Sequence, residues 1–119
     1  MAAAPDPCTP DLVDLCRLRV EDLDPVLEEE RLTWRSTLSW DFHSSAELVR
    51  RFLRIQALNG YALVSGDRIV GYSYQVCEDR KGLVGDLYLL REFATPENEA
   101  CLLDAVLQSL LVIPHLQRI

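Results

Sequence analysis

The sequence has little positive charge. Its 119 residues include 12 lysines and arginines against 19 aspartates and glutamates, so the net charge is −7 and the isoelectric point is near 4.7. Proteins that bind DNA or RNA hold the phosphates with lysine and arginine. We therefore expect no nucleic-acid partner.

Long apolar runs are also missing. The longest of them is well short of the roughly 20 residues that a helix needs to cross a bilayer. The first stretch, MAAAPDPCTPD, has neither the basic nor the apolar region of a signal peptide. These absences predict no membrane partner and a cytoplasmic location.

Metal-ligating residues are few and widely spaced. The chain has four cysteines and two histidines, which are Cys8, Cys16, Cys77, Cys101, His43 and His115. No C-x-x-C pair occurs among them, so the sequence predicts no metal site. Three of the cysteines, Cys16, Cys77 and Cys101, lie within apolar patterns and are expected to be reduced core residues.

The length suits one compact domain. Residues 1–12 contain three prolines and three alanines and are expected to form a flexible tail before a domain over 13–119. In chain order, the patterns predict a strand at 15–20, a helix at 21–34, a packed connection at 35–43, a helix at 45–58, strands at 60–65, 68–77 and 83–90, a helix at 97–112 and the start of a strand at 115–119.

Local signals define several of these elements. Gly66-Asp67 is a hairpin turn, Gly60 is a natural helix terminator, and Pro25 suits only the first turn of its helix. Ser44 and Glu47 have the spacing of a capping box. The apolar sides of the first two helices are expected to carry Leu23, Val26, Leu27 and Leu32, and then Leu48, Phe52, Ile55 and Leu58.

Three stretches, in this order, resemble a known family. CRLRVEDLDPVLE is similar to its first strand and helix, GYALVSGDRIVGYSYQV to its second and third strands, and GDLYLLREFATPENEACLLDAVL to its fourth strand, phosphate loop and third helix. In this register Leu89 replaces the usual valine at the strand end, and Leu102-Leu103 matches the leucine pair of the helix. The family that these stretches resemble is the GNAT N-acetyltransferase superfamily.

The resemblance implies an α/β fold, a GNAT-like mixed sheet in which an antiparallel three-strand meander is flanked by helices. The apolar alternation that begins at HLQRI predicts a fragment, the N-terminal two-thirds of the fold, truncated in or before the fifth strand. The tyrosine or serine that commonly protonates the leaving thiolate lies after that strand, so the resemblance assigns no catalytic acid here.

The resemblance also implies an acetyl-CoA site. Its pantetheine arm would contact the backbone of the fourth strand, and its diphosphate would lie on the following loop; the residues are Leu87, Tyr88, Leu89, Leu90, Ala94, Thr95, Glu97, Asn98 and Glu99. The loop departs from the family pattern R/Q-x-x-G-x-G/A, because Ala94 replaces the Arg or Gln and Glu97 and Glu99 replace the glycines. The two carboxylates and the missing glycines disfavour tight diphosphate binding.

Asp86, in the middle of an apolar strand, is the candidate catalytic base, with a solvated or capping carboxylate as the alternative. The candidate acceptor-binding residues are Trp40, His43, Tyr72 and Tyr74, with ordinary core and sheet packing as the alternative for each. The arginines Arg50, Arg51 and Arg54 are expected to form a solvated helix face.

Two functions stay open at this point. The first is an acetyl-CoA-dependent N-acetyltransferase acting on a small-molecule or peptide amine, with weak or no activity in an isolated fragment. The second is a catalytically degenerate GNAT-like domain that serves as a structural or protein-interaction module. The apolar helix LLDAVLQSLLVI and the unpaired fourth strand predict a homodimer or contact with the missing C-terminal part.

Overall fold

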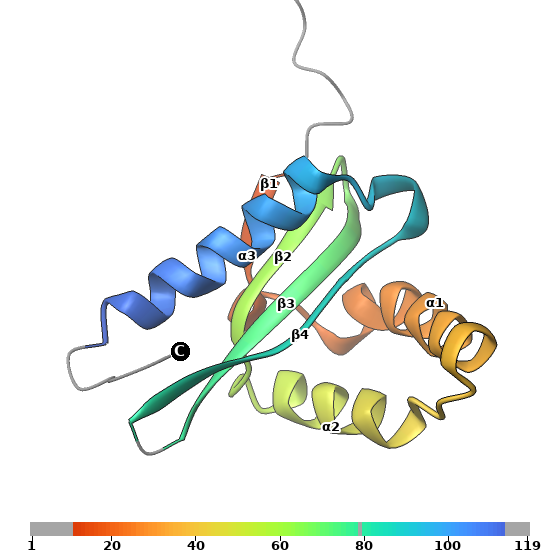
Figure 1. Cartoon of the computed structure of the whole chain (residues 1–119), viewed down its shortest axis with the longest axis horizontal. Helices are drawn as coiled ribbons and strands as arrows, with labels where there is room; N and C mark the ends of the chain where they lie inside the picture. The colour runs from red at the N-terminus through yellow and green to blue at the C-terminus, as the bar shows by residue number, and fades with distance from the viewer. Residues whose placement is uncertain (1–10, 79, 114–119) are drawn as a thin grey trace, which may run out of the picture.

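The computed structural model describes residues 11–78 and 80–113, and the predicted strand at 115–119 lies outside them. The elements are β1 Asp11–Asp14, a 3₁₀ helix Leu15–Arg17, α1 Val20–Leu38, α2 His43–Arg54, β2 Asn59–Ser65, β3 Arg68–Glu78, β4 Lys81–Leu89, a 3₁₀ helix Arg91–Phe93 and α3 Pro96–Leu111. The four strands form one sheet in the order β1-β2-β3-β4, and each neighbouring pair is antiparallel (Figure 1). The predicted α/β class and the antiparallel meander are confirmed.

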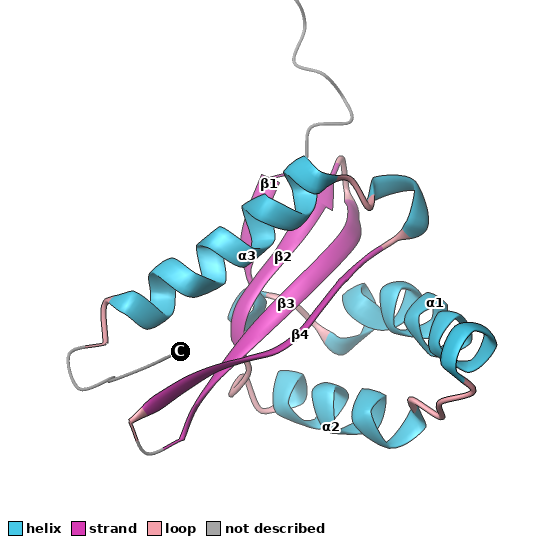
Figure 2. Ribbon diagram, viewed as in Figure 1, coloured by secondary structure: helices cyan, strands magenta, loops and turns pink. Residues whose placement is uncertain are grey.

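Helices cover both faces of this sheet (Figure 2). On one face Tyr61 of β2 accepts a hydrogen bond from Ser109 of α3. Tyr72 of β3 bonds instead to Glu30 of α1. Tyr61 pairs with Ser73, so these two side chains point to the same face of the sheet. Tyr72 precedes Ser73 in β3 and therefore points to the other face. Helices α3 and α1 thus lie on opposite sides of the sheet. The main apolar core fills the space between α1, α2 and the sheet.

The first strand lies earlier in the chain than predicted. The segment 15–20 was expected to be a strand because Cys16, Leu18 and Val20 alternate with arginines, but residues 11–14 pair with β2 instead. The side chain of Asp14 accepts from the Cys16 N–H, which starts the 3₁₀ turn and turns Leu15 into the core. The tail prediction was therefore too long, because residues 11 and 12 belong to the sheet.

Helix α1 buries Leu23, Val26 and Leu27 as predicted. It begins at Val20, so Pro25 lies inside the helix rather than in its first turn, and it continues to Leu38. Leu32 is 52% exposed, and the stripe that includes Leu27 continues instead through Glu30, which has no exposed surface. A carboxyl group thus occupies a core position of α1.

The predicted inner face of α2 was wrong except at Leu58, which is buried but lies after the end of the helix. Leu48, Phe52 and Ile55 are exposed, and the buried residues of the helix are Ala46, Val49 and Leu53. The capping box was wrong too: the helix begins at His43, and Asp41 rather than Ser44 accepts a hydrogen bond from its first N–H. The turn after α2 comes at Gln56, with a positive φ of 57°, while Gly60 lies within β2.

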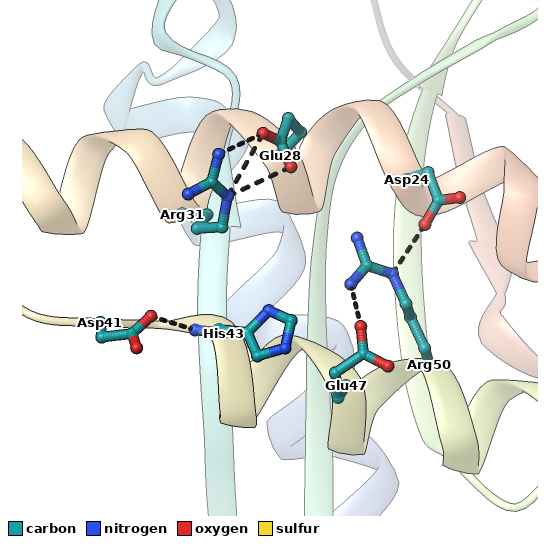
Figure 3. A network of polar contacts seen from close by, with 7 residues as sticks. All are labelled: Asp24, Glu28, Arg31, Asp41, His43, Glu47 and Arg50. Atoms are coloured by element: carbon teal, nitrogen blue, oxygen red, sulfur yellow. Dashed lines mark hydrogen bonds and ion pairs between the residues drawn. The ribbon is translucent and has the colours of Figure 1, made fainter.

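Ion pairs accompany this orientation of α2. Arg50 of α2 donates to Asp24 of α1 at 2.9 Å and to Glu47 at 2.7 Å (Figure 3). The neighbouring pair Glu28 and Arg31 lies on α1 beside this contact. Because Arg50 lies between the helices, it is half-buried rather than fully solvated as predicted.

The hairpin and helix predictions after residue 60 are confirmed. Gly66 has a positive φ of 66° in the turn between β2 and β3. Helix α3 starts at Pro96, with Thr95 as its N-cap, and ends at Leu111.

The core assignment of the cysteines was wrong, because Cys77 and Cys101 are exposed and Cys16 is half-buried.

Candidate functional site

The sheet brings Asp86 to the site where β4 changes register. Asp86 pairs with Tyr74, and the register against β3 shifts between Tyr74 and Gln75, so Gly85 forms a bulge. A bulge bends its strand and redirects the neighbouring side chain. A Cβ on Gly85 would lie 1.9 Å from the Tyr74 ring, so glycine permits the ring to pack here.

Two other groups contact the Asp86 carboxyl. Its Oδ2 accepts from the Tyr72 hydroxyl at 3.0 Å, and its Oδ1 accepts from the Leu87 N–H at 2.8 Å. The Tyr72 hydroxyl also lies 2.6 Å from Oε1 of Glu30, and Trp34 donates its indole N–H to the other Glu30 oxygen at 3.0 Å. Helix α1 thus places a second carboxyl group opposite Asp86.

Burial changes the protonation of this cluster. Desolvation, followed by the nearby Asp86 carboxyl, raises the pKa of Glu30 to about 9. Desolvation and the two carboxyls also raise the pKa of Tyr72 and, to a lesser extent, that of Tyr74. These shifts favour the neutral acid form of Glu30 and the protonated hydroxyls of both tyrosines.

A second polar cluster anchors the end of β4 to α1. The Tyr88 hydroxyl donates to Glu29 at 2.7 Å, and the Arg91 N–H donates to the same Glu29 oxygen at 3.0 Å. Desolvation, with a smaller contribution from Glu29, raises the pKa of Tyr88 to about 12. Tyr88, which the sequence analysis assigned to the cofactor site, thus uses its side chain to contact α1.

In the described sheet, β4 is an edge strand that pairs only with β3. The Leu90 N–H donates to Val70, and in an antiparallel pair the hydrogen-bonded positions alternate. Leu87 and Leu89 therefore direct their backbone groups to the open edge, and Asp86 already accepts from the Leu87 N–H. The Leu89 N–H and the carbonyls of Leu87 and Leu89 suit the amide groups of an extended pantetheine arm.

The loop after β4 does not suit a diphosphate in the same way. An anion at a helix N-terminus needs unpaired backbone N–H groups. Pro96 has none, the Asn98 N–H donates to Thr95 Oγ1 at 3.2 Å, and the Glu99 N–H donates to the Thr95 carbonyl at 2.9 Å. The N–H groups of Ala94 and Thr95 bond to residues of the preceding 3₁₀ turn.

The charges of this loop add to the mismatch. Glu97 and Glu99 are exposed in the first turn of α3, where they oppose an incoming anion. The nearby cation Arg68 already pairs with Glu92 at 3.0 Å and lies over the Phe93 ring. The residues present therefore suit the amide arm of acetyl-CoA but not its diphosphate.

Removing the two charges tests this mismatch. The double variant Glu97→Gln/Glu99→Gln is expected to lower the Kd for acetyl-CoA by about 10- to 30-fold, since each carboxylate near a diphosphate costs about 1 kcal/mol. Isothermal titration calorimetry measures the change. Asp104→Asn, further along α3, is the matched control and should leave the Kd unchanged; equal affinities of the double variant and the wild type would contradict the electrostatic account.

Among the candidate acceptor residues, Tyr72 and Tyr74 lie beside Asp86. Tyr72 is fully buried, so it contacts the two carboxyls rather than an open groove. Tyr74 stacks on Tyr72 with ring centroids 6.3 Å apart and lines a mainly apolar hollow of about 430 Å³. Leu48 and Phe52 of α2, which the sequence assigned to the core, line the same hollow.

Trp40 and His43 lie apart from this cluster, in the connection between α1 and α2 and at the start of α2. Trp40 is 46% exposed, packs edge-on against Phe42 and contacts Trp34 at 6.2 Å between ring centroids. Together with Arg31 and Arg35 it borders a polar hollow of about 350 Å³. Trp34, which contacts Trp40 and donates to Glu30, links this region to the cluster.

Glu29, Glu30 and Trp34 are the residues that sequence reasoning missed. The available signal was the spacing of Leu23, Val26, Leu27 and Glu30, which puts a carboxyl on the apolar stripe of α1. Among the described residues no three histidine, cysteine or acidic side chains gather as a metal site would require. No helix in the described ranges combines the length and apolar composition of a bilayer-crossing segment.

No protein-family model and no curated protein matches the chain. Among solved structures, it is similar to a possible acetyltransferase from Clostridium difficile 630, with a TM-score of 0.70 and 12% sequence identity. The match covers 92% of this chain and 76% of that one. The chain has an acetyltransferase-like fold. In this acetyltransferase-like domain, Asp86 lies at the bulge of β4, beside the open strand edge.

Proposed function

We propose that this protein is a GNAT-type N-acetyltransferase that transfers an acetyl group from acetyl-CoA to an amine. The observation that carries the proposal is the position of Asp86, a partly exposed carboxylate at the bulge of an open edge strand. The likeness to a possible acetyltransferase supports it at the level of the fold. When bound, acetyl-CoA supplies a thioester whose acetyl group an amine can accept.

The residues of this chain would prepare the amine. A protonated amine has no lone pair for attack, so a nearby base must first accept its proton. Asp86 takes that proton, which breaks the N–H bond of the ammonium, and then releases it to water. The hollow beside Tyr74 is mainly apolar, so we expect acceptors that join the amine to an apolar body.

A second function is favoured by one observation, the loop before α3. The N–H groups of Ala94, Thr95, Asn98 and Glu99 are used internally, and the first helical turn is acidic, as expected of a domain that no longer holds a diphosphate. In that case the domain would serve as a structural or protein-interaction module.

An acetyl-transfer assay separates the two. The protein is incubated with millimolar acetyl-CoA and an arylalkylamine, a short alkylamine or a polyamine, and released coenzyme A thiol is measured. We expect thiol release that depends on the amine and is fastest with the arylalkylamine, which joins a protonated amine to an apolar body. A thermal melt with acetyl-CoA accompanies it, because a site filled to 100 times its Kd adds about 2.7 kcal/mol of stability. If neither thiol release nor a thermal shift occurs, the transferase proposal fails and the interaction module remains.

A further inference from the structure

The Tyr72 hydroxyl has one hydrogen but two carboxyl neighbours. Its oxygen lies 2.6 Å from Glu30 Oε1 and 3.0 Å from Asp86 Oδ2. If both carboxyls were charged, the hydroxyl could donate to only one of them. The other would then face an oxygen lone pair inside the core, which is an unfavourable arrangement for a buried charge.

No cation among the described residues offsets a negative charge on Glu30, and the hydrogen bonds from Tyr72 and Trp34 stabilise it less than burial and Asp86 destabilise it. Trp34 on its own helix, Tyr72 on β3 and Asp86 on β4 are the groups that act on it. Tyr74 and Tyr88 are the next titratable groups on the same face of the sheet, and Glu29 contacts Tyr88. None of these is a cation, and none of the ion pairs among the described residues includes Glu30.

One proton between the carboxyls resolves this conflict. With the proton on Glu30, its O–H donates to the Tyr72 oxygen, and the Tyr72 O–H donates to Asp86. Asp86 also accepts from the Leu87 N–H, and Glu30 accepts from Trp34 through its other oxygen. Each of these donors then has an acceptor, and the negative charge lies on the carboxyl that is partly exposed.

We infer that Glu30 and Asp86 share one proton through the Tyr72 hydroxyl, and that Glu30 is a positioning residue that keeps Asp86 as the charged member of the pair. Glu30 acts through Tyr72 and touches no substrate. The inference depends on the proposed function only in its consequence, namely that the charged Asp86 serves as the base. The raised pKa of Glu30 agrees with this assignment.

Carbon-13 NMR of the side-chain carboxyls in the unliganded protein tests the inference. Glu30→Gln identifies the Glu30 resonance by its disappearance. We expect that resonance to stay in its protonated position through pH 7 and to titrate with a midpoint near 9. Asp86→Asn removes the neighbouring charge and should move the midpoint down by at least about one pH unit, which is a tenfold change in proton affinity. The control variant Glu28→Gln, on the exposed side of α1, should leave the titration midpoint of Glu30 unchanged.

A Glu30 midpoint near 4.5 in the wild type would overturn the inference, and so would a midpoint that Asp86→Asn does not move. The first of these results does not depend on Asp86→Asn. It needs only the wild type and Glu30→Gln, whose side chain can make the same hydrogen bonds as the neutral acid. The measurement uses no acetyl-CoA and no acceptor. A failed transfer assay would therefore refute the proposed function and leave the titration result intact.

Discussion

Replacing Asp86 with asparagine is expected to lower kcat/KM for acetyl transfer by at least about 100-fold. A positioned general base contributes about 10²- to 10⁴-fold to rate, and asparagine keeps the shape of the side chain but cannot accept the amine proton. A 100-fold loss corresponds to about 2.7 kcal/mol of transition-state stabilisation. The measurement is amine-dependent thiol release at saturating acetyl-CoA.

The control for this variant is Asp67→Asn, an exposed carboxyl in the turn between β2 and β3, outside the cluster of Glu30, Tyr72 and Asp86. It should leave kcat/KM unchanged. Thermal melts of both proteins show whether the fold is retained. Should Asp86→Asn keep full activity, Asp86 is not the base, and its carboxyl only closes the bulge of β4.

Replacing Glu30 with glutamine is expected to stabilise the protein at neutral pH. Glutamine can donate to the Tyr72 oxygen and accept from Trp34, as the neutral acid does, but it needs no proton. The wild type must bind a proton to fold above the unfolded-state pKa of about 4.5. We expect near-equal stability at pH 5 and an advantage for glutamine of up to about 3 kcal/mol at pH 7.

The direction of the pH dependence follows from the sign of the shift. Between about pH 4.5 and pH 9 the folded protein holds one proton more than the unfolded chain at this residue. The stability of the wild type therefore falls as the pH rises, by up to about 1.4 kcal/mol per pH unit from Glu30. The stabilising contribution of Glu30 to the free energy of unfolding is fully present only below pH 4.5. Urea denaturation at pH 5, 7 and 8.5 measures both proteins.

Alanine at the same position separates charge from packing. At pH 5, Glu30→Ala should cost about 3 kcal/mol, because it leaves a cavity and deprives the partly buried Trp34 N–H of its acceptor. The difference in unfolding free energy between the wild type and Glu30→Ala should become smaller as the pH rises, because the wild type loses stability and the alanine variant does not. Parallel stability curves for the wild type and the glutamine variant over this range would show that Glu30 folds in its charged form.

The sequence by itself determined the elements that have strong local signals. Gly66-Asp67 specifies a hairpin, and Thr95 with Pro96 specifies the start of α3, because both depend on backbone geometry within a few residues. Asp86 also stood out without a structure, as a carboxylate in the middle of an apolar strand. Its predicted role stays a prediction.

Tertiary packing decided the rest. Helix α2 buries Ala46, Val49 and Leu53 and leaves Leu48 and Phe52 exposed, and in this orientation Arg50 reaches Asp24 of α1, a contact between elements that no local pattern encodes. The 15–20 alternation gave way to a capped turn because Asp14 and the partner strand β2 selected another register.

The candidate site depended most on the tertiary structure. Tyr72 meets Glu30 across 42 positions of sequence and Asp86 across 14, and only the packing of α1 onto the sheet brings the two carboxyls to one hydroxyl. The sequence placed a carboxyl on the apolar stripe of α1. The fold decided that this carboxyl lies in the core beside a second one, where burial and repulsion between the two charges favour a single proton for the pair.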